Sequence, residues 1–209
     1  MGRNEDDLKK FAAYLEHVTE QSDWIGQVLS QNLYPIRPDA TVACLAAGYC
    51  EELLQVRRVV GRGAKIFAFD NTVPNPNAVL AIVGSESDFR KRDIRDIDQL
   101  IGEMGGVPHL IVCRHPKVLV STTPRTGRIQ ETQGWWGDVL SEWGEKLDPS
   151  GQMIITTFTK FERDFIAERM AQHGLNPVTG ENQLAPSELS LKVGPHFALP
   201  DGFTITVRS

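Results

Sequence analysis

The chain has 209 residues, of which 41% are hydrophobic and 23% are charged, and its formal net charge is -5 at pH 7. Such a chain can bury one substantial core, which excludes a fibrous, collagen-like or disordered polymer. The weakly acidic balance gives little non-specific attraction to a phosphate backbone, so a nucleic acid partner is not favoured.

The cysteines and the first residues of the chain both indicate in which cellular compartment the protein is found. Cys44, Cys50 and Cys113 are odd in number and lack paired spacing, which argues against a disulfide framework and against a metal site. Residues 1–10 are polar and acidic, and no run reaches the ~20 apolar residues that a membrane span needs. We therefore expect a cytoplasmic protein with no membrane contact.

The hydrophobic pattern predicts the elements in chain order. Apolar residues recur at helical spacing between residues 6 and 33, which predicts an N-terminal helical extension over residues 1–37 and one domain over residues 38–209. In that domain, apolar runs and amphipathic segments alternate. The predicted strands are 41–47, 65–69, 110–113, 153–158 and 203–207, and the predicted helices are 51–60, 97–104, 135–146 and 162–173. The polar segment 121–133 is predicted to be a loop.

This alternation predicts the fold class. A connection between parallel strands needs a crossover that is long enough to be a helix, so the pattern indicates an α/β fold with a mostly parallel sheet. Ligands of such sheets bind at the carboxyl ends of the strands.

Two segments at predicted strand ends suit a nucleoside ligand. The turn that contains Ala46, Ala47 and Gly48 has side chains small enough for a ligand to lie against the backbone. Asp70 ends the next strand, where nucleotide-binding folds place a carboxylate for ribose hydroxyls. Both features also fit a plain alternative, because tight turns need small residues and Asp commonly begins a turn.

The turn resembles the first motif of class I S-adenosylmethionine-dependent methyltransferases, an acidic residue followed by Gly-x-Gly-x-Gly. Gly48 stands at the middle glycine, Ala46 and Cys50 at the outer two, and Cys44 at the acidic residue, so the glycine-rich motif is degenerate. The resemblance covers about residues 38–209. It implies a Rossmann-like, mostly parallel seven-stranded sheet with helices on both faces, and S-adenosyl-L-methionine as the cofactor.

The same resemblance implies which residues contact the cofactor. The third motif of the family corresponds to Asp93 and Ile94, which would bracket the adenine, although the charged run 88–98 also fits a solvated face. The full set of implied cofactor-binding residues is Ala46, Ala47, Gly48, Tyr49, Asp70, Asn71, Asp93, Ile94, Cys113 and Arg114.

His115 follows the predicted strand 110–113 and is the candidate catalytic residue, because an imidazole can act as a general base near neutral pH. The neighbouring Arg114 could instead hold a carboxylate or phosphate through its planar guanidinium. The alternative for His115 is a surface residue in a loop.

The resemblance implies a methyltransferase whose methyl acceptor the sequence does not identify. A small-molecule substrate is favoured, and a protein side chain or a nucleic acid stays open. Cys44, Ala46 and Cys50 favour an alternative, a non-catalytic Rossmann-like binding or interaction module with weakened cofactor binding. A nicotinamide-dependent oxidoreductase is disfavoured, because Glu51 and Glu52 would repel a pyrophosphate at the helix start.

Overall fold

A seven-stranded sheet forms the centre of the computed structural model, which describes residues 23–47, 52–71, 87–116, 118–121, 129–132, 134–183 and 201–209. The strand order is β3-β2-β1-β4-β7-β9-β8. Strand β9 is antiparallel to its neighbours β7 and β8, and the other pairings are parallel. The strands are β1 (Thr41–Leu45), β2 (Lys65–Asp70), β3 (Ser87–Lys91), β4 (Leu110–Arg114), β7 (Gln152–Thr157), β8 (Val178–Glu181) and β9 (Phe203–Arg208). The predicted mostly parallel seven-stranded sheet is thereby confirmed.

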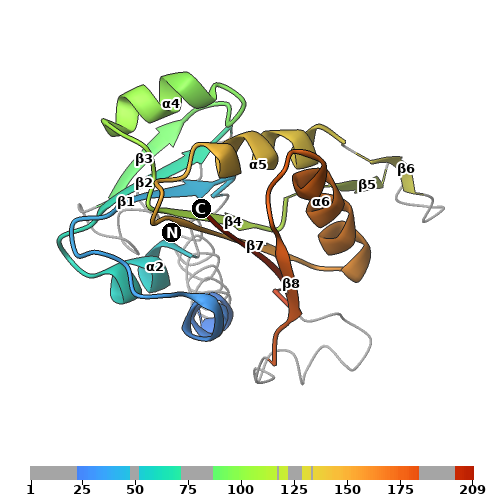
Figure 1. The fold of residues 1–209 in the computed structure, drawn as a ribbon, viewed down its shortest axis with the longest axis horizontal. Helices are drawn as coiled ribbons and strands as arrows, with labels where there is room; N and C mark the ends of the chain where they lie inside the picture. The colour runs from blue at the N-terminus through green and yellow to red at the C-terminus, as the bar shows by residue number, and fades with distance from the viewer. Residues whose placement is uncertain are drawn as a thin grey trace, which may run out of the picture.

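Helices cover both faces of this sheet. One face carries α4 (Ile97–Met104), α5 (Trp135–Glu145) and α6 (Lys160–Gln172), and the other carries α2 (Leu53–Val60) and the helical residues 23–32 (Figure 1). Among the described residues, none of the helices combines the length and the hydropathy that a membrane span requires.

Two apolar clusters, one on each face, explain why the strands read as continuous apolar runs. Along β1, Ala43 and Leu45 pack into the cluster under α4, α5 and α6, whereas Val42 and Cys44 pack into the cluster under α2. A strand that is covered on both sides needs apolar residues at every position. The helical residues 23–32 complete the second cluster with Trp24, Ile25, Val28 and Leu29, so this part of the N-terminal segment belongs to the core.

The structure differs from the prediction at the edges of the sheet. Strand β3 overlaps the charged run 88–98, and neither β3 nor the exposed strand β8 was predicted. Both are edge strands, whose side chains are less completely covered and are often charged, so the continuous apolar run is missing. The predicted loop 121–133 includes β6 (Ile129–Thr132), which pairs with β5 (Leu119–Ser121) in a separate antiparallel ribbon.

The strand order reverses at β1, and this reversal locates the expected ligand site. The chain runs from β1 to β2 and β3 on one side, then crosses back to β4 on the other side of β1. The connections that leave β1 and β4 therefore diverge and open a crevice outside the carboxyl ends of these strands.

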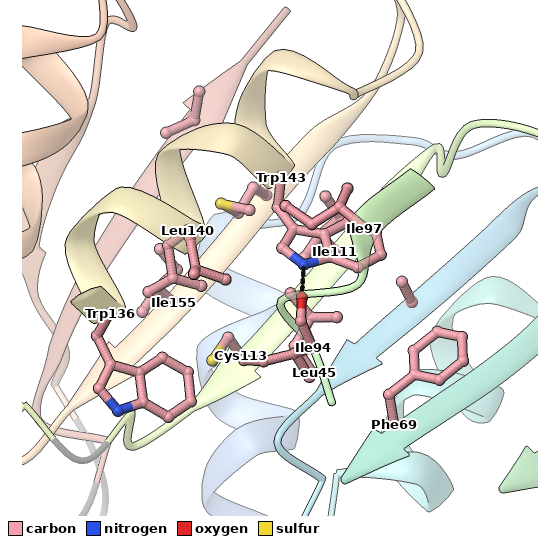
Figure 2. Packing of buried hydrophobic residues seen from close by; sticks show 14 of the residues in the cluster. Leu45, Phe69, Ile94, Ile97, Ile111, Cys113, Trp136, Leu140, Trp143 and Ile155 are labelled. Carbon is pink, nitrogen blue, oxygen red and sulfur yellow. Dashed lines mark hydrogen bonds between the residues drawn. The ribbon is translucent and has the colours of Figure 1, made fainter. Parts of the chain in front are cut away.

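Trp143 links helix α5 to the loop that follows β3. Its fully buried indole Nε1 donates a hydrogen bond to the carbonyl oxygen of Ile94 at 2.9 Å (Figure 2). Trp143→Phe should lower the free energy of unfolding by about 2 kcal/mol, because the Ile94 carbonyl loses its donor and a small cavity remains. Equilibrium urea denaturation measures this change.

The matched control is Trp135→Phe in the same helix, where the ring is only partly buried. We expect a loss below about 1 kcal/mol there. Equal losses at the two positions would contradict the special contribution of Trp143.

Candidate functional site

A pocket lies at the carboxyl edge of the sheet, where four separate segments of the chain meet. These are the turn after β1, the end of β2, the loop between β3 and α4, and the first turn of α5. Its lining residues are Ala46, Asp70, Asn71, Asp93, Ile94, Arg95, Trp135 and Trp136. Five of these eight residues, Ala46, Asp70, Asn71, Asp93 and Ile94, are cofactor-binding residues implied by the sequence resemblance.

The turn after β1 brings the backbone to the pocket. Ala46 has a φ of +52°, a left-handed conformation that costs an alanine about 1–2 kcal/mol relative to the right-handed one. The next residue, Ala47, is buried, and its N–H donates to the carbonyl of Phe69 in β2 at 3.1 Å. The conformation that usually selects glycine is thus present at Ala46. Gly48 and Tyr49 lie outside the described residues.

Two buried carboxylates lie near the ends of the central strands. Asp70 is the last residue of β2, and Glu52 precedes α2. Burial raises the pKa of the Cys113 thiol, and the charges of Glu52 and Asp70 raise it further, so both carboxylates lie close to the end of β4. Cys113 itself is fully buried in β4 and does not line the pocket. The sequence indicated Glu52 only as a negative charge at the start of a helix, where it would repel a pyrophosphate.

The loop after β3 supplies a charged acceptor beside an apolar side chain. Hydrogen bonds from the Arg95 guanidinium lower the pKa of Asp93, with Nε 2.9 Å from Oδ1 and 3.1 Å from Oδ2. Asp93 is therefore ionised at neutral pH. Its neighbour Ile94 is buried, and the bond from Trp143 fixes its carbonyl.

Charged residues of β3 and α4 hold this loop in place. The Glu103 carboxylate in α4 accepts hydrogen bonds from Arg90 at 3.0 Å and from Arg92 at 2.9 Å. Gln99 donates to the same carboxylate at 2.9 Å. These bonds join both ends of the segment that carries Asp93.

Arg114 takes part in a buried ion pair and does not line the pocket. Its Nε lies 3.0 Å from Oδ1 of Asp201, and its Nη2 contacts Oδ2. Thr156 donates to the same carboxylate at 2.5 Å. Burial alone would raise the pKa of Asp201, but the charge of Arg114 and hydrogen bonds from His115 and Arg114 outweigh it, and the pKa is lowered. The guanidinium proposed for substrate binding is thus engaged with Asp201.

His115 lies at the end of β4, beside the same carboxylate and outside the pocket lining. Its Nε2 is 3.0 Å from the backbone nitrogen of Asp201 and 3.0 Å from Oδ1 of that residue. The neutral ring can accept from the N–H and the protonated ring can donate to the carboxylate, so each protonation state has a partner. Phe158 stacks on the imidazole with the ring centroids 3.8 Å apart.

Arg95, Trp135 and Trp136 line the pocket although the sequence analysis did not assign them to it. Trp136 lies with Val139, Leu140 and Trp143 on one face of α5, and all four side chains are buried in the core. The adjacent Trp135 packs against the edge of the same core and is only partly buried. Within the described ranges, no group of His, Cys, Asp and Glu side chains is arranged to hold a metal ion.

Solved structures with a similar fold include several methyltransferases. Precorrin-6y C5,15-methyltransferase from Geobacter metallireducens aligns with a TM-score of 0.57 and 13% identity over 88% of this chain and 86% of its own. The S-adenosylmethionine-dependent O-methyltransferase of Thermotoga maritima aligns with a TM-score of 0.59 and 11% identity over 90% of this chain and 64% of its own. Fibrillarin from Aeropyrum pernix, which holds natively bound S-adenosyl-L-methionine, aligns with a TM-score of 0.60 and 8% identity over 91% of this chain and 76% of its own.

The chain therefore has the Rossmann-like fold of class I S-adenosylmethionine-dependent methyltransferases, as its sequence resemblance implied. No protein-family model and no curated protein matches the sequence. At these identities the likeness concerns the fold, so the arguments about activity depend on the pocket itself.

Removing the Asp201 charge tests the buried ion pair. Asp201→Asn should lower the free energy of unfolding by about 3 kcal/mol or more, because the buried Arg114 would lose its counter-charge. Urea denaturation checks this, with Asp98→Asn as the control. Asp98 forms an exposed ion pair with Lys146, so its loss should cost less than about 1 kcal/mol. Similar small losses for both variants would show that the buried pair is not needed.

The hydrogen bonds to Glu103 predict a change in acid stability. Gln99, Arg92 and Arg90 lower the pKa of Glu103 from its ordinary value of 4.5 to about 2 in the folded protein. Stabilisation by Glu103 is therefore complete above pH 4.5 and is lost as the pH falls towards 2. Glu103→Gln should flatten the decline of the unfolding free energy in that window, measured by urea denaturation at several pH values. Parallel curves for the two proteins would refute this.

Proposed function

We propose that the protein is an S-adenosylmethionine-dependent methyltransferase whose pocket holds the nucleoside part of the cofactor. One observation carries the proposal. Five residues chosen from the sequence for this role, from three separate segments, line a single pocket at the point where the strand order reverses. Chance matches to weak motifs would leave such residues scattered over the fold.

The groups in the pocket match the donors of an adenosine. The Asp70 carboxylate, which ends β2 and lines the pocket, would accept hydrogen bonds from ribose hydroxyls. Asp93 would accept from the exocyclic amine of the adenine, and Ile94 would pack against the ring. The small side chain of Ala46 leaves room for the cofactor to approach the backbone. When bound, the cofactor supplies an electrophilic methyl group on a sulfonium sulfur.

Charge favours this cofactor over a dinucleotide. The buried carboxylates of Asp70 and Glu52 make the neighbourhood attractive to a sulfonium cation and repulsive to a pyrophosphate. A carboxylate at the start of α2 also occupies the helix end that would otherwise favour a phosphate.

The methyl acceptor in this proposal is a small molecule, and His115 is the candidate base. The net charge of -5 argues against a polyanionic substrate. Since Asp201 offers a partner to both the neutral and the protonated imidazole, His115 could take up a proton without losing its position. We also propose a cytoplasmic location, with which the free, buried thiol of Cys113 agrees.

Isothermal titration calorimetry with S-adenosylmethionine, S-adenosylhomocysteine and NAD tests the proposal. We expect binding of the first two ligands only. Binding of NAD alone would replace the proposal with an oxidoreductase. Binding of none of the three would favour the non-catalytic interaction module.

Asp70→Ala tests the ribose contact. The variant should bind S-adenosylhomocysteine at least about tenfold more weakly, because a charged hydrogen-bond acceptor is lost from a buried position. Calorimetry gives the dissociation constant, and Asp98→Ala, which removes an exposed carboxylate outside the pocket, should leave it unchanged. An unaltered affinity in Asp70→Ala would remove Asp70 from the site.

A further inference from the structure

Trp136 presents a buried hydrogen-bond donor that the described part of the chain does not use. Its side chain lines the pocket and is only 6% exposed, yet the indole Nε1 has no hydrogen-bond partner among the residues that the structure describes. In Figure 2 this nitrogen points away from the packed side chains of Leu140 and Ile155, on the side where the strands end. Trp143 lies two helical turns further along α5, and its Nε1 donates a hydrogen bond to the carbonyl oxygen of Ile94.

Core packing explains why an aromatic ring is present at position 136, but it does not explain why the ring carries an N–H group. The ring belongs to the apolar cluster under α4, α5 and α6, where a phenylalanine would bury comparable apolar surface. An unsatisfied buried donor costs free energy, and native structures pair nearly all such groups. A donor that is left unpaired at the wall of a pocket is therefore expected to meet its acceptor on a ligand.

The geometry of the pocket wall supports this role. Trp135 stacks on Trp136 with the ring centroids 4.5 Å apart, and the Arg95 guanidinium lies over the Trp135 ring at 5.4 Å. Both partners also line the pocket, so the orientation of the Trp136 ring is set before a ligand arrives. Such preorganisation reduces the entropy that binding would otherwise cost.

We infer that Trp136 is a ligand-binding residue whose indole N–H donates a hydrogen bond to an acceptor atom of the bound nucleoside. This inference rests on the proposed function and adds to it a buried hydrogen-bond donor. Asp70 and Asp93 are carboxylates and only accept hydrogen bonds, whereas a nucleoside also carries acceptors, the ring nitrogens of its base and its sugar oxygens. Trp136 therefore adds a buried donor to a lining that also contains the donors of Asn71 and Arg95.

Two replacements at position 136 separate the N–H group from the ring. Trp136→Phe keeps an aromatic ring, and L-3-benzothienylalanine at the same position keeps the shape of the indole while sulfur replaces the N–H. Calorimetry with S-adenosylhomocysteine measures affinity, and thermal unfolding without ligand measures stability. We expect both replacements to weaken binding about fivefold or more, as the loss of one hydrogen bond predicts.

The stability of the ligand-free protein gives a second, independent measurement. Replacement of Trp136 by benzothienylalanine should leave the unfolding temperature unchanged or raise it, because no protein bond is lost. Trp143→Phe is the matched comparison in the same helix and should lower the unfolding temperature, because its N–H has a protein acceptor.

The outcomes distinguish this inference from the proposed function. If the unaltered protein binds S-adenosylhomocysteine and the benzothienylalanine variant binds it equally well, the role of Trp136 is refuted and the proposed function stands. A fall in the unfolding temperature of that variant similar to the fall for Trp143→Phe would also refute it, since the N–H would then have a protein partner. If the unaltered protein binds neither S-adenosylmethionine nor S-adenosylhomocysteine, both proposals fail together.

Discussion

Pairing of β1 with β2 on one side and with β4 on the other is the constraint on which the pocket depends. Leu45, the last residue of β1, is level with Phe69 in β2 and with Cys113 in β4. In the next ladder, Asp70 is level with Lys91 in β3. Parallel strands in this register end together, so the residues that follow them meet at one edge of the sheet. The convergence of Ala46, Asp70 and Asp93 follows from this register.

The turn after β1 shows that a backbone conformation can persist when its usual residue is absent. Class I methyltransferases place glycine at the position of Ala46, and Ala46 adopts a positive φ there. Alanine adds one methyl group, so a ligand can still approach the backbone closely. The hydrogen bond from Ala47 to Phe69 and the burial of Ala47 hold the turn in this conformation. Ala46 therefore keeps a conformation that usually favours glycine.

The elements that could be predicted from the sequence are those that lie inside the sheet or against it. Helix α4 has the predicted bounds, and β4 differs by one residue, because continuous apolar runs and glycine stops mark buried elements clearly. Strands β3 and β8 at the sheet edges lack that pattern. Asp70 could be found because it ends a predicted apolar strand, and Asp93 could be found only through the resemblance to the third motif of the family.

Other contacts could not be found because they join distant parts of the chain. Arg114 pairs with Asp201, 87 residues away, and Trp143 bonds to Ile94 across 49 residues. No local pattern marks such partners. Trp136 shows a different difficulty, because one side chain both packs in the core and lines the pocket, and a helical pattern reveals only the first role.

Backbone strain gathers at the same edge of the sheet as the pocket. Among the described non-glycine residues, positive φ values occur at Ala46, His115 and Asp201. Ala46 follows β1 and His115 follows β4, while Asp201 precedes β9, whose antiparallel direction brings its start to the carboxyl ends of the others. Each such residue costs about 1–3 kcal/mol and persists only where its surroundings hold it. At Asp201 the buried bonds from Arg114 and Thr156 supply that support. In the described part of the chain, the strained non-glycine residues thus lie at the edge of the sheet where chemistry is expected.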